Sequence, residues 1–238
     1  MILETHEHRH AAFVTLTYAP EHLPKDQCVH KKHLQNFIKR LRKTLEPRRL
    51  RYFAVGEYGS KTMRPHYHCI LYGVSPTESD VLQTCWTFGL IHCGTAEAAS
   101  IQYVSGYVVK SMTKTTDKRL EGKNPEFALM SRKPGLGYGV VPRMVEAYHT
   151  AAGQTVLEQE HWIASRIQQE QKKYPLGRYL TEKVVSQLGL TKEERKNHLA
   201  KLCRIMYDKK ATQTTTEYEK IRKAKVQQQR AQQKKDTL

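Results

Sequence analysis

Three short stretches in the first 75 residues have the alternating, β-branched and aromatic side chains that are typical of strands. The first, residues 12–18 (AFVTLTY), is followed by Pro20 and Pro24, which end it. Two more are expected at residues 50–58 and 66–73, with a loop containing Gly and Ser between them. The short connection predicts that these two strands pair as an antiparallel hairpin.

The segment between the first two strands repeats apolar side chains every three or four residues, as an amphipathic helix does. This helix is expected at residues 30–45, and Pro47 ends it. Its apolar positions are Leu34, Phe37, Ile38, Leu41 and Leu45. Lysines and arginines occupy many of the other positions, so the outer face of the helix is basic.

A second helix and a further strand follow the hairpin. Residues 75–78 (SPTE) have the pattern of a capping box with proline at the first helical position, and the helix is expected to end at about Thr87. A strand at 90–94 and a helix at 97–112 complete the order β-α-β-β-α-β-α. This order predicts an α+β fold in which helices pack on an antiparallel sheet.

The remainder of the chain is expected to be mainly helical. Residues 133–137 (KPGLG) form a turn-rich loop. Further helices are expected near residues 142–150, 155–171, 178–188 and 191–206. Residues 208–238 are rich in Gln and Lys with few apolar side chains, which is typical of a solvated helix or a disordered tail. We therefore expect three segments, with boundaries at 1–140, 141–207 and 208–238.

Basic residues outnumber acidic ones by 40 to 23, which gives a net charge of +17. Such a surplus is typical of a protein that binds a polyanion, most simply nucleic acid. Residues 29–51 hold +8 of this charge, whereas residues 52–130 are neutral. The candidate contacts to DNA phosphates are Lys31, Lys32, Lys39, Arg40, Arg42, Lys43, Arg48, Arg49, Arg51, Arg64 and Lys133. For the basic helix, a merely solvated face is the alternative interpretation.

Several classes of protein do not fit the sequence. No apolar run approaches the roughly 18 residues of a membrane span, and the N-terminus lacks the basic and apolar blocks of a secretion signal. The five cysteines include no CxxC pair, which argues against a disulfide framework and a cysteine zinc site. No GxxxxGK[ST] loop is present, so we expect no nucleotide cofactor. These features predict a protein of the reducing cytoplasm without a membrane partner.

Residues 64–72 (RPHYHCILY) place a His-hydrophobe-His motif inside a strand. His66 and His68 project from the same face because strand side chains alternate. If the hairpin pairs antiparallel, Glu57 on the preceding strand shares that face. Two imidazoles and one carboxylate suit a divalent cation such as Mg²⁺ or Mn²⁺. The alternative is a pair of ordinary sheet histidines beside an unrelated surface carboxylate.

Residues 100–110 (SIQYVSGYVVK) place two tyrosines and a lysine on one face of a helix. Tyr103 and Tyr107 are four residues apart, and Lys110 follows three residues later. A phenol, with an ordinary pKa of about 10, is a poor nucleophile unless a nearby cation or a metal-polarised phosphate assists it. The lysine is a candidate for that cation. Two core aromatic residues beside a solvated lysine are the alternative.

Taken together, these motifs resemble the HUH (His-hydrophobe-His) endonucleases that initiate rolling-circle DNA replication. The matching blocks follow the order of that family: FVTLTY at 13–18, Glu57 before PHYH at 65–68, and YVSGYVVK at 103–110. The segments FVTLTYAPEHLP, VGEYGSKTMRPHYHCILYG and LMSRKPGLG resemble in particular the initiators of small single-stranded DNA phages, the Microviridae, of the gokushovirus type. The resemblance covers roughly residues 4–140. Those initiators usually have an upstream segment containing Cys and Arg, so a shortened form is one interpretation of this chain.

The resemblance implies an origin-nicking enzyme in the cytoplasm of a bacterial host. Glu57, His66 and His68 would hold the metal, and Tyr103 or Tyr107 would attack the DNA to form a 5′-phosphotyrosine link. A free 3′-OH would remain for a host polymerase, and the second tyrosine would later help to close the displaced strand into a circle. The implied partners are single-stranded and origin DNA, together with host replication proteins.

Three other functions stay open on the sequence alone. An HUH transposase with a single tyrosine would share the metal site, and a plasmid-mobilising relaxase would more often use a third histidine and an N-terminal tyrosine. A non-catalytic nucleic-acid-binding protein would explain the charge but would leave Glu57, His66 and His68 without a purpose.

Overall fold

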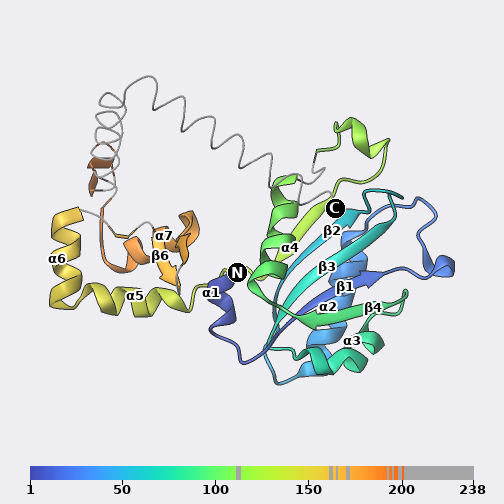
Figure 1. Cartoon of the computed structure of the whole chain (residues 1–238), viewed down its shortest axis with the longest axis horizontal. Coiled ribbons are helices and arrows are strands. Elements are labelled where there is room, and N and C mark those ends of the chain that lie inside the picture. The colour runs from blue at the N-terminus through green and yellow to red at the C-terminus, as the bar shows by residue number, and fades with distance from the viewer. Residues whose placement is uncertain are drawn as a thin grey trace. The chain divides into compact units, whose positions relative to one another are not determined.

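A five-stranded antiparallel sheet is the centre of residues 1–143 in the computed structural model (Figure 1). The strands lie in the order β4-β1-β3-β2-β5. Their bounds are β1 Ala11–Thr17, β2 Arg51–Tyr58, β3 Pro65–Tyr72, β4 Ile91–Thr95 and β5 Phe127–Met130. The structure describes residues 1–110, 114–160, 163–164, 166–169, 172–191, 193–194, 196–197 and 200.

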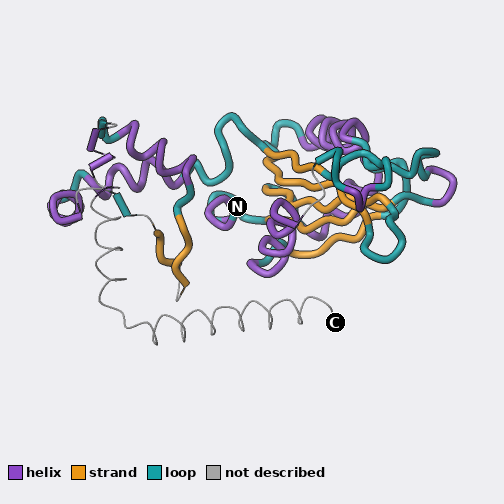
Figure 2. Tube along the Cα trace, turned by 90° about the horizontal axis from the view of Figure 1, so that it is seen from above, coloured by secondary structure: helices purple, strands orange, loops and turns teal. Residues whose placement is uncertain are grey.

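Helices cover both faces of the sheet. Their bounds are α1 Ile2–Thr5, α2 Lys31–Leu45, α3 Ser79–Cys85, α4 Ala98–Lys110 and α5 Val140–Tyr148. Figures 1 and 2 show α2 and α4 on opposite sides of the strands. Short 3-10 helices lie at Pro20–His22, Pro76–Glu78 and Lys118–Leu120. Each layer therefore buries one apolar side of the sheet, as an α+β fold requires.

The larger part of the core lies between the sheet and α2. Every apolar position predicted for this helix is buried, while its lysines are exposed. The helix ends before Glu46, whose backbone is extended because it precedes Pro47. On β1, Val14 and Leu16 alternate toward α2, and the buried Trp86 closes this core beside α3.

A smaller core lies on the opposite face, under α4. Ile101 and Val104 of α4 pack with Phe53, Ile70 and Tyr72 of the sheet. The face is apolar at this end of the strands and polar at the other end, where His66 and His68 lie. The helix therefore covers one part of the face and ends its cover close to the candidate ligands.

The sequence predicted most of this unit correctly. The order β-α-β-β-α-β-α from β1 to α4, the antiparallel hairpin and the capping box at Ser75 are confirmed. The expected helix at 97–112 corresponds to α4, and residues 111–113 lie outside the described residues. The short elements α1 and β5 were not predicted.

Residues 144–238 form a second unit, which contains α6 Ala151–Glu160 and α7 Arg178–Gln187. The helix expected at 155–171 is wrong after residue 160, because β6 Arg166–Gln169 and β7 Lys172–Pro175 pair as an antiparallel hairpin. The predicted helices near 142–150 and 178–188 correspond to α5 and α7. The helix expected at 191–206 lies mostly outside the described residues, and the tail at 208–238 lies wholly outside them.

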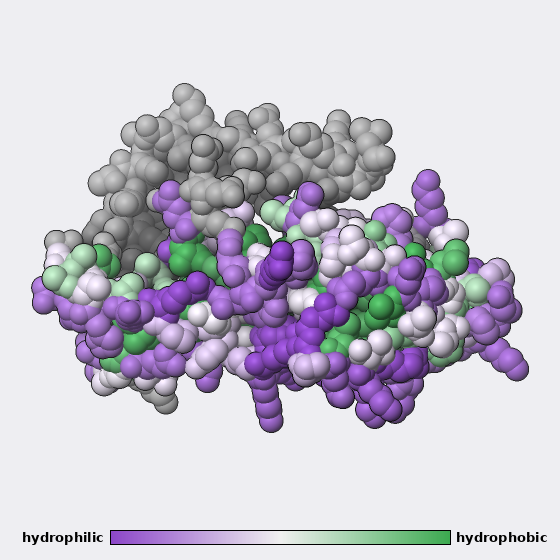
Figure 3. Space-filling view, turned by 90° about the horizontal axis from the view of Figure 1, so that it is seen from below, coloured by the Kyte–Doolittle hydropathy of each residue, from purple (hydrophilic) through white to green (hydrophobic). Residues whose placement is uncertain are grey.

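The surface of the protein is mainly hydrophilic on the face drawn in Figure 3, where hydrophobic side chains form small patches. Within the described part of the chain, the helices lack either the length or the apolar character that crossing a bilayer demands.

Candidate metal centre and adjacent tyrosine

The hairpin of β2 and β3 brings the three predicted ligands together. Glu57 lies directly opposite His66 in the antiparallel register, and His68 lies two residues further along on the same face. The Glu57 Oε1 atom lies 2.8 Å from His66 Nε2 and 3.0 Å from His68 Nε2. One ligand atom from each residue lies within 4.8 Å of the others. The predicted placement on one face is therefore confirmed, and the group could hold a metal ion.

Both imidazole rings are anchored through their other nitrogen. His66 Nδ1 lies 3.1 Å from the carbonyl oxygen of Arg64, and His68 Nδ1 lies 2.9 Å from Thr15 Oγ1 on β1. Because a carbonyl can only accept, His66 Nδ1 carries the proton in its contact. Such partners orient a ligating histidine, so that Nε2 faces the cation. The anchors thus direct both Nε2 atoms toward Glu57.

The carboxylate of Glu57 has a second oxygen that is not used by the protein. Glu57 is 3% exposed, and its Oε2 atom is buried without a hydrogen-bond partner among the described residues. A buried carboxylate oxygen without a partner is costly. A divalent cation coordinated by this oxygen and by the histidine Nε2 atoms would satisfy it, so the donor set fits a metal ion.

The two sides of the centre shift in opposite directions on the pH scale. Burial acts to raise the pKa of Glu57, but hydrogen bonds from His66 and His68 outweigh it, so the pKa lies below its usual value. Burial acts to lower the pKa of His66, but its hydrogen bonds to Glu57 and to the Arg64 carbonyl raise it above its usual value. The carboxylate is therefore held in its charged form, which is the form that binds a cation.

Tyr103 of α4 lies beside this centre. Its ring contacts the His68 ring edge to face, with centroids 5.5 Å apart, and also contacts Phe13 at 6.3 Å. Phe13 in turn stacks on His68, with centroids 5.6 Å apart. The tyrosine is 50% exposed, so it stands at the open side of the centre. Tyr107 and Lys110 belong to α4 by their backbone, but their side chains lie outside the described residues.

Several predicted DNA contacts are exposed on the surface of the first unit. Two aromatic rings are covered by these cations: Lys31 Nζ lies 5.5 Å from the Phe127 ring centroid, and the Arg42 guanidinium lies 5.4 Å from the Tyr52 centroid. The exposed members are Lys31, Lys32, Lys39, Arg42, Lys43, Arg48, Arg49, Arg64 and Lys133. Exposure leaves them available to a polyanion.

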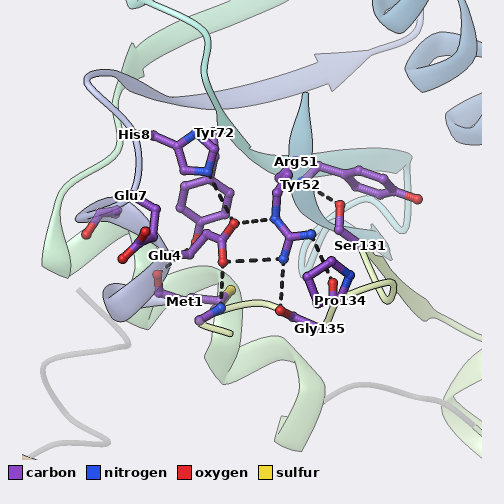
Figure 4. Close-up of polar contacts among 12 residues, drawn as sticks. Met1, Glu4, Glu7, His8, Arg51, Tyr52, Tyr72, Ser131, Pro134 and Gly135 are labelled. Atoms are coloured by element: carbon purple, nitrogen blue, oxygen red, sulfur yellow. Dashed lines mark hydrogen bonds and ion pairs between the residues drawn. The ribbon is translucent and has the colours of Figure 1, made fainter. Parts of the chain in front are cut away.

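Arg51 is not available for the phosphate contact that the sequence predicts. It is 7% exposed, and its guanidinium forms a salt bridge with Glu4 of α1 (Figure 4). It also donates to the carbonyl oxygens of Pro134 and Gly135, both at 2.9 Å. These partners occupy the side chain inside the fold, where it joins α1, β2 and the loop at 134–137.

Three other predicted cations also have partners within the protein. Arg40 Nε donates to the carbonyl oxygen of Cys85 at 2.8 Å, and Arg64 Nη2 donates to that of Tyr18 at 2.8 Å. Arg48 forms a two-pronged contact with Glu78, with distances of 2.6 and 3.1 Å. Arg48 and Arg64 remain partly open to solvent, whereas Arg40 contributes mainly to holding α2 against α3.

Thr15 and Phe13 are parts of the site that sequence reasoning missed. Both alternate onto the face of β1 that carries the candidate ligands, and Thr15 lies opposite His68 in the register between β1 and β3. Their alternation was visible in the sequence. What was missing was the pairing partner of β1, which connects residues 53 positions apart.

Comparison with known proteins identifies the family. Residues 11–112 match the family model of Replication-associated protein ORF2. The matched segment runs from β1 to just beyond α4, and it contains all three candidate ligands and both tyrosines. The chain belongs to this family.

Three relatives of the family are phage proteins. The chain is 33% identical over 153 residues to Replication-associated protein ORF2 of Spiroplasma virus 4, which covers 55% of this chain and 47% of the relative. It is 34% identical over 128 residues to Replication-associated protein VP4 of Bdellovibrio phage phiMH2K, covering 44% and 40%. For Replication-associated protein ORF4 of Chlamydia phage 1 the identity is 28% over 130 residues, covering 45% and 32%. The matches thus span less than half the length of each relative. No solved structure matches the chain significantly.

Proposed function

We propose that this chain is an initiator of rolling-circle replication that nicks one DNA strand by metal-assisted transesterification. The observation that supports this most directly is the position of Tyr103, whose ring contacts His68 beside the Glu57–His66–His68 group. A candidate nucleophile and a candidate metal centre are thus side by side on one face of the sheet. A protein that only binds DNA would not need that pairing.

In the proposed reaction the Tyr103 phenol gives up its proton and its Oη atom attacks the scissile phosphorus. The new phosphorus–Oη bond forms as the phosphorus–O3′ bond breaks, and the departing O3′ takes a proton to become a free hydroxyl. The result is a 5′-phosphotyrosine link that conserves the phosphodiester energy. Attack by a 3′-OH on that link reverses the step and joins the strand without a nucleotide cofactor.

The chain's own residues hold the reacting groups in place. Glu57 supplies negative charge, His66 and His68 supply neutral nitrogen donors, and the anchors at Arg64 and Thr15 fix the two rings. A divalent cation such as Mg²⁺ or Mn²⁺ held there would polarise the scissile phosphate and offset the charge that develops on it. Tyr103, half exposed beside that position, can meet a phosphate that reaches the centre from solvent.

Tyr107 and Lys110 complete the proposal from the helical spacing of α4. Residues four apart lie on the same helical face, so Tyr107 is the candidate for the second nucleophile that acts when the displaced strand is closed. Lys110, three residues further on, is the candidate cation that assists a phenol. Either tyrosine could attack first.

Fold and family support the same function. The β-α-β-β-α-β connection with strand order β4-β1-β3-β2 is that of ferredoxin-like folds, which agrees with the expected HUH endonuclease architecture. The three relatives are named as replication-associated proteins. The exposed cations of α2 would hold DNA phosphates, and host replication proteins would extend the free 3′-OH.

Adduct formation tests the proposal. The full chain is incubated with Mn²⁺ and a randomised single-stranded DNA pool labelled at the 3′ end, and denatured products are separated by electrophoresis. A labelled covalent adduct is expected, because the 3′ fragment carries the phosphate that joins the tyrosine. The same pool labelled at its 5′ end should instead release free fragments. EDTA should abolish both products.

Variants assign the roles. The Tyr103→Phe/Tyr107→Phe double variant should form no adduct, while Tyr179→Phe, a change at an exposed tyrosine of the second unit, should form it normally. Glu57→Gln should also lose the adduct. An adduct that survives in the double tyrosine variant would contradict the nucleophile assignment. DNA binding without any adduct would favour a non-catalytic binding protein, and adduct formation only in the presence of a single tyrosine would favour the transposase type.

A further inference from the structure

Two neighbouring cavities form a basic groove at the edge of the sheet far from the metal centre. One, of about 290 Å³, lies along α2, and the other, of about 350 Å³, extends past β2 to residues 130–133. Arg42 and Tyr52 line both cavities, so the two form one continuous depression. The exposed cations that line this basic groove are Lys32, Lys39, Arg42, Arg49, Arg132 and Lys133.

The charge in the basic groove is of one sign. No acidic side chain is among the described residues that line either cavity. Arg51 also lines the groove, but it is neutralised by Glu4. Concave surfaces lined by cations concentrate anions and bind phosphates. The partner is therefore a polyanion with several phosphates in a row, because six cations share one depression.

The groove is rigidly built. The Tyr52 N–H donates to Ser131 Oγ at 3.1 Å, and the Ser131 N–H donates to the Tyr52 carbonyl at 2.9 Å. These bonds continue the pairing of β2 with β5 beyond Met130 and fix the segment that carries Arg132 and Lys133. Arg51 then holds the next residues through the carbonyls of Pro134 and Gly135. Cations are thus presented from ordered backbone on both walls.

The basic groove does not belong to the proposed cleavage site. Tyr52 and Glu57 are five residues apart on β2, so their side chains lie on opposite faces of the sheet. The same five residues separate them by about 17 Å along the strand. That distance corresponds to about five base-pair steps of B-DNA. A phosphate in the groove is therefore not the phosphate that is cut.

We infer that the basic groove binds the phosphate backbone of duplex DNA that flanks the cleaved strand, an inference that rests on the proposed function. Single-stranded DNA sites combine cations with free aromatic faces on which bases stack. Here the aromatic ring, Tyr52, is half-buried and covered by the Arg42 guanidinium. A groove of cations without an open stacking surface contacts phosphates alone, which positions a duplex without reading its sequence.

The test measures duplex binding in EDTA, so that it does not depend on cleavage. Fluorescence anisotropy with a labelled duplex of arbitrary sequence gives the affinity of the full chain from about 50 to 200 mM salt, where each phosphate contact contributes about 0.9 to the logarithmic slope. The groove variant Arg42→Gln/Arg132→Gln/Lys133→Gln should lower that slope by about 2.7. The control variant Lys25→Gln/Lys114→Gln/Lys118→Gln removes the same charge from exposed lysines outside the groove and should lower it by less than about 1.

Further measurements separate the outcomes. If the triple variant unfolds more easily than the wild type, Arg132→Gln/Lys133→Gln alone should lower the slope by about 1.8, because both side chains are exposed. Equal slopes for the groove and control variants would overturn the inference. So would a groove variant that loses affinity for single-stranded DNA but keeps its affinity for the duplex. A wild type that binds the duplex through the groove but forms no tyrosine adduct would instead contradict the proposed function alone.

Discussion

The Thr15 hydroxyl contributes to the candidate metal centre without being a ligand. It lies 2.9 Å from His68 Nδ1 and so orients the ring whose Nε2 faces Glu57. Loss of such a partner typically lowers metal affinity 10- to 100-fold. Thr15→Val keeps the size and branching of the side chain but removes the hydroxyl. We expect it to weaken Mn²⁺ binding by about 10-fold or more, measured by calorimetry.

Thr15→Ser is the matched control, because it restores the hydroxyl while losing a methyl group. It should bind Mn²⁺ with nearly the affinity of the wild type. Thermal melting without metal should show that both variants are folded. Equal Mn²⁺ affinity in Thr15→Val and the wild type would contradict a positioning role and leave Thr15 as an ordinary sheet residue.

The candidate ligands could be predicted at the residue scale because their placement depends on local geometry. His66 and His68 share a face by alternation, and Glu57 joins them through a hairpin whose two strands are close in sequence. The contact of Tyr103 with His68 could not be predicted, since it depends on how α4 crosses the sheet. The burial of Arg51 was missed for the same reason, because its partner Glu4 lies 47 residues earlier in the chain.

The contact between β2 and β5 depends on a glycine at the element scale. A Cβ atom at Gly56 would lie 2.7 and 2.8 Å from two ring carbons of Phe127 on β5. Gly56→Ala therefore overpacks this strand pair and should lower the free energy of unfolding by about 1–3 kcal/mol. Urea denaturation of the wild type and the variant measures the change.

Gly106 of α4 provides the opposite case. A Cβ there would meet no described atom within 4 Å, and alanine is the better helix former by about 1 kcal/mol. Gly106→Ala should therefore raise the urea midpoint slightly, while Gly56→Ala lowers it. Similar small effects for both substitutions would show that Phe127 moves away without cost.

The buried pair of Glu4 and Arg51 links α1 to β2 and makes stability depend on pH (Figure 4). Burial acts to raise the pKa of Glu4, but hydrogen bonds from Arg51, the Gly137 N–H and His8 lower it below its usual 4.5. A lowered pKa stabilises the fold above pH 4.5, and this stabilisation is lost as the pH falls through the lowered value. Glu4→Gln should cost about 3 kcal/mol at pH 7, because it leaves Arg51 buried with less compensation.

Urea denaturation at pH 7, 5 and 4 checks this expectation, and the difference between Glu4→Gln and the wild type should shrink at the lowest pH. Glu7→Gln is the matched control, because Glu7 pairs with Arg143 at the surface. It should cost less than about 1 kcal/mol at every pH. A difference for Glu4→Gln that stays constant with pH would contradict the role assigned to its charge.

Long periodic elements were predictable, and short ones were not. The helix α2 repeats its apolar positions over 15 residues, which leaves little ambiguity. The strand β5 has four residues and exists because it pairs with β2, which no local pattern reveals. The hairpin of β6 and β7 was predicted as a helix because its Gln and Lys residues favour helices, and the pairing of the two strands overrides that preference.

At the scale of the whole molecule, the core of the first unit is complete within residues 1–143. Both clusters of buried apolar residues draw their members from positions 1–136, and the candidate ligands and Tyr103 lie in the same range. The positive charge is divided differently, with +9 in residues 1–143 and +8 in residues 144–238. The second unit therefore adds nearly half of the attraction to a polyanion without adding to the core around the metal centre.

A fragment of residues 1–143 tests this division of roles. It should unfold cooperatively and bind Mn²⁺ with the affinity of the full chain, because the core and the ligands are retained. Its duplex binding should be weaker with a smaller salt slope, because +8 of charge has been removed. Circular dichroism, calorimetry and anisotropy measure the three properties. If the fragment lost Mn²⁺ affinity while remaining folded, residues 144–238 would have to contribute to the metal centre. An unchanged salt slope would mean instead that the charge of the second unit does not face the DNA.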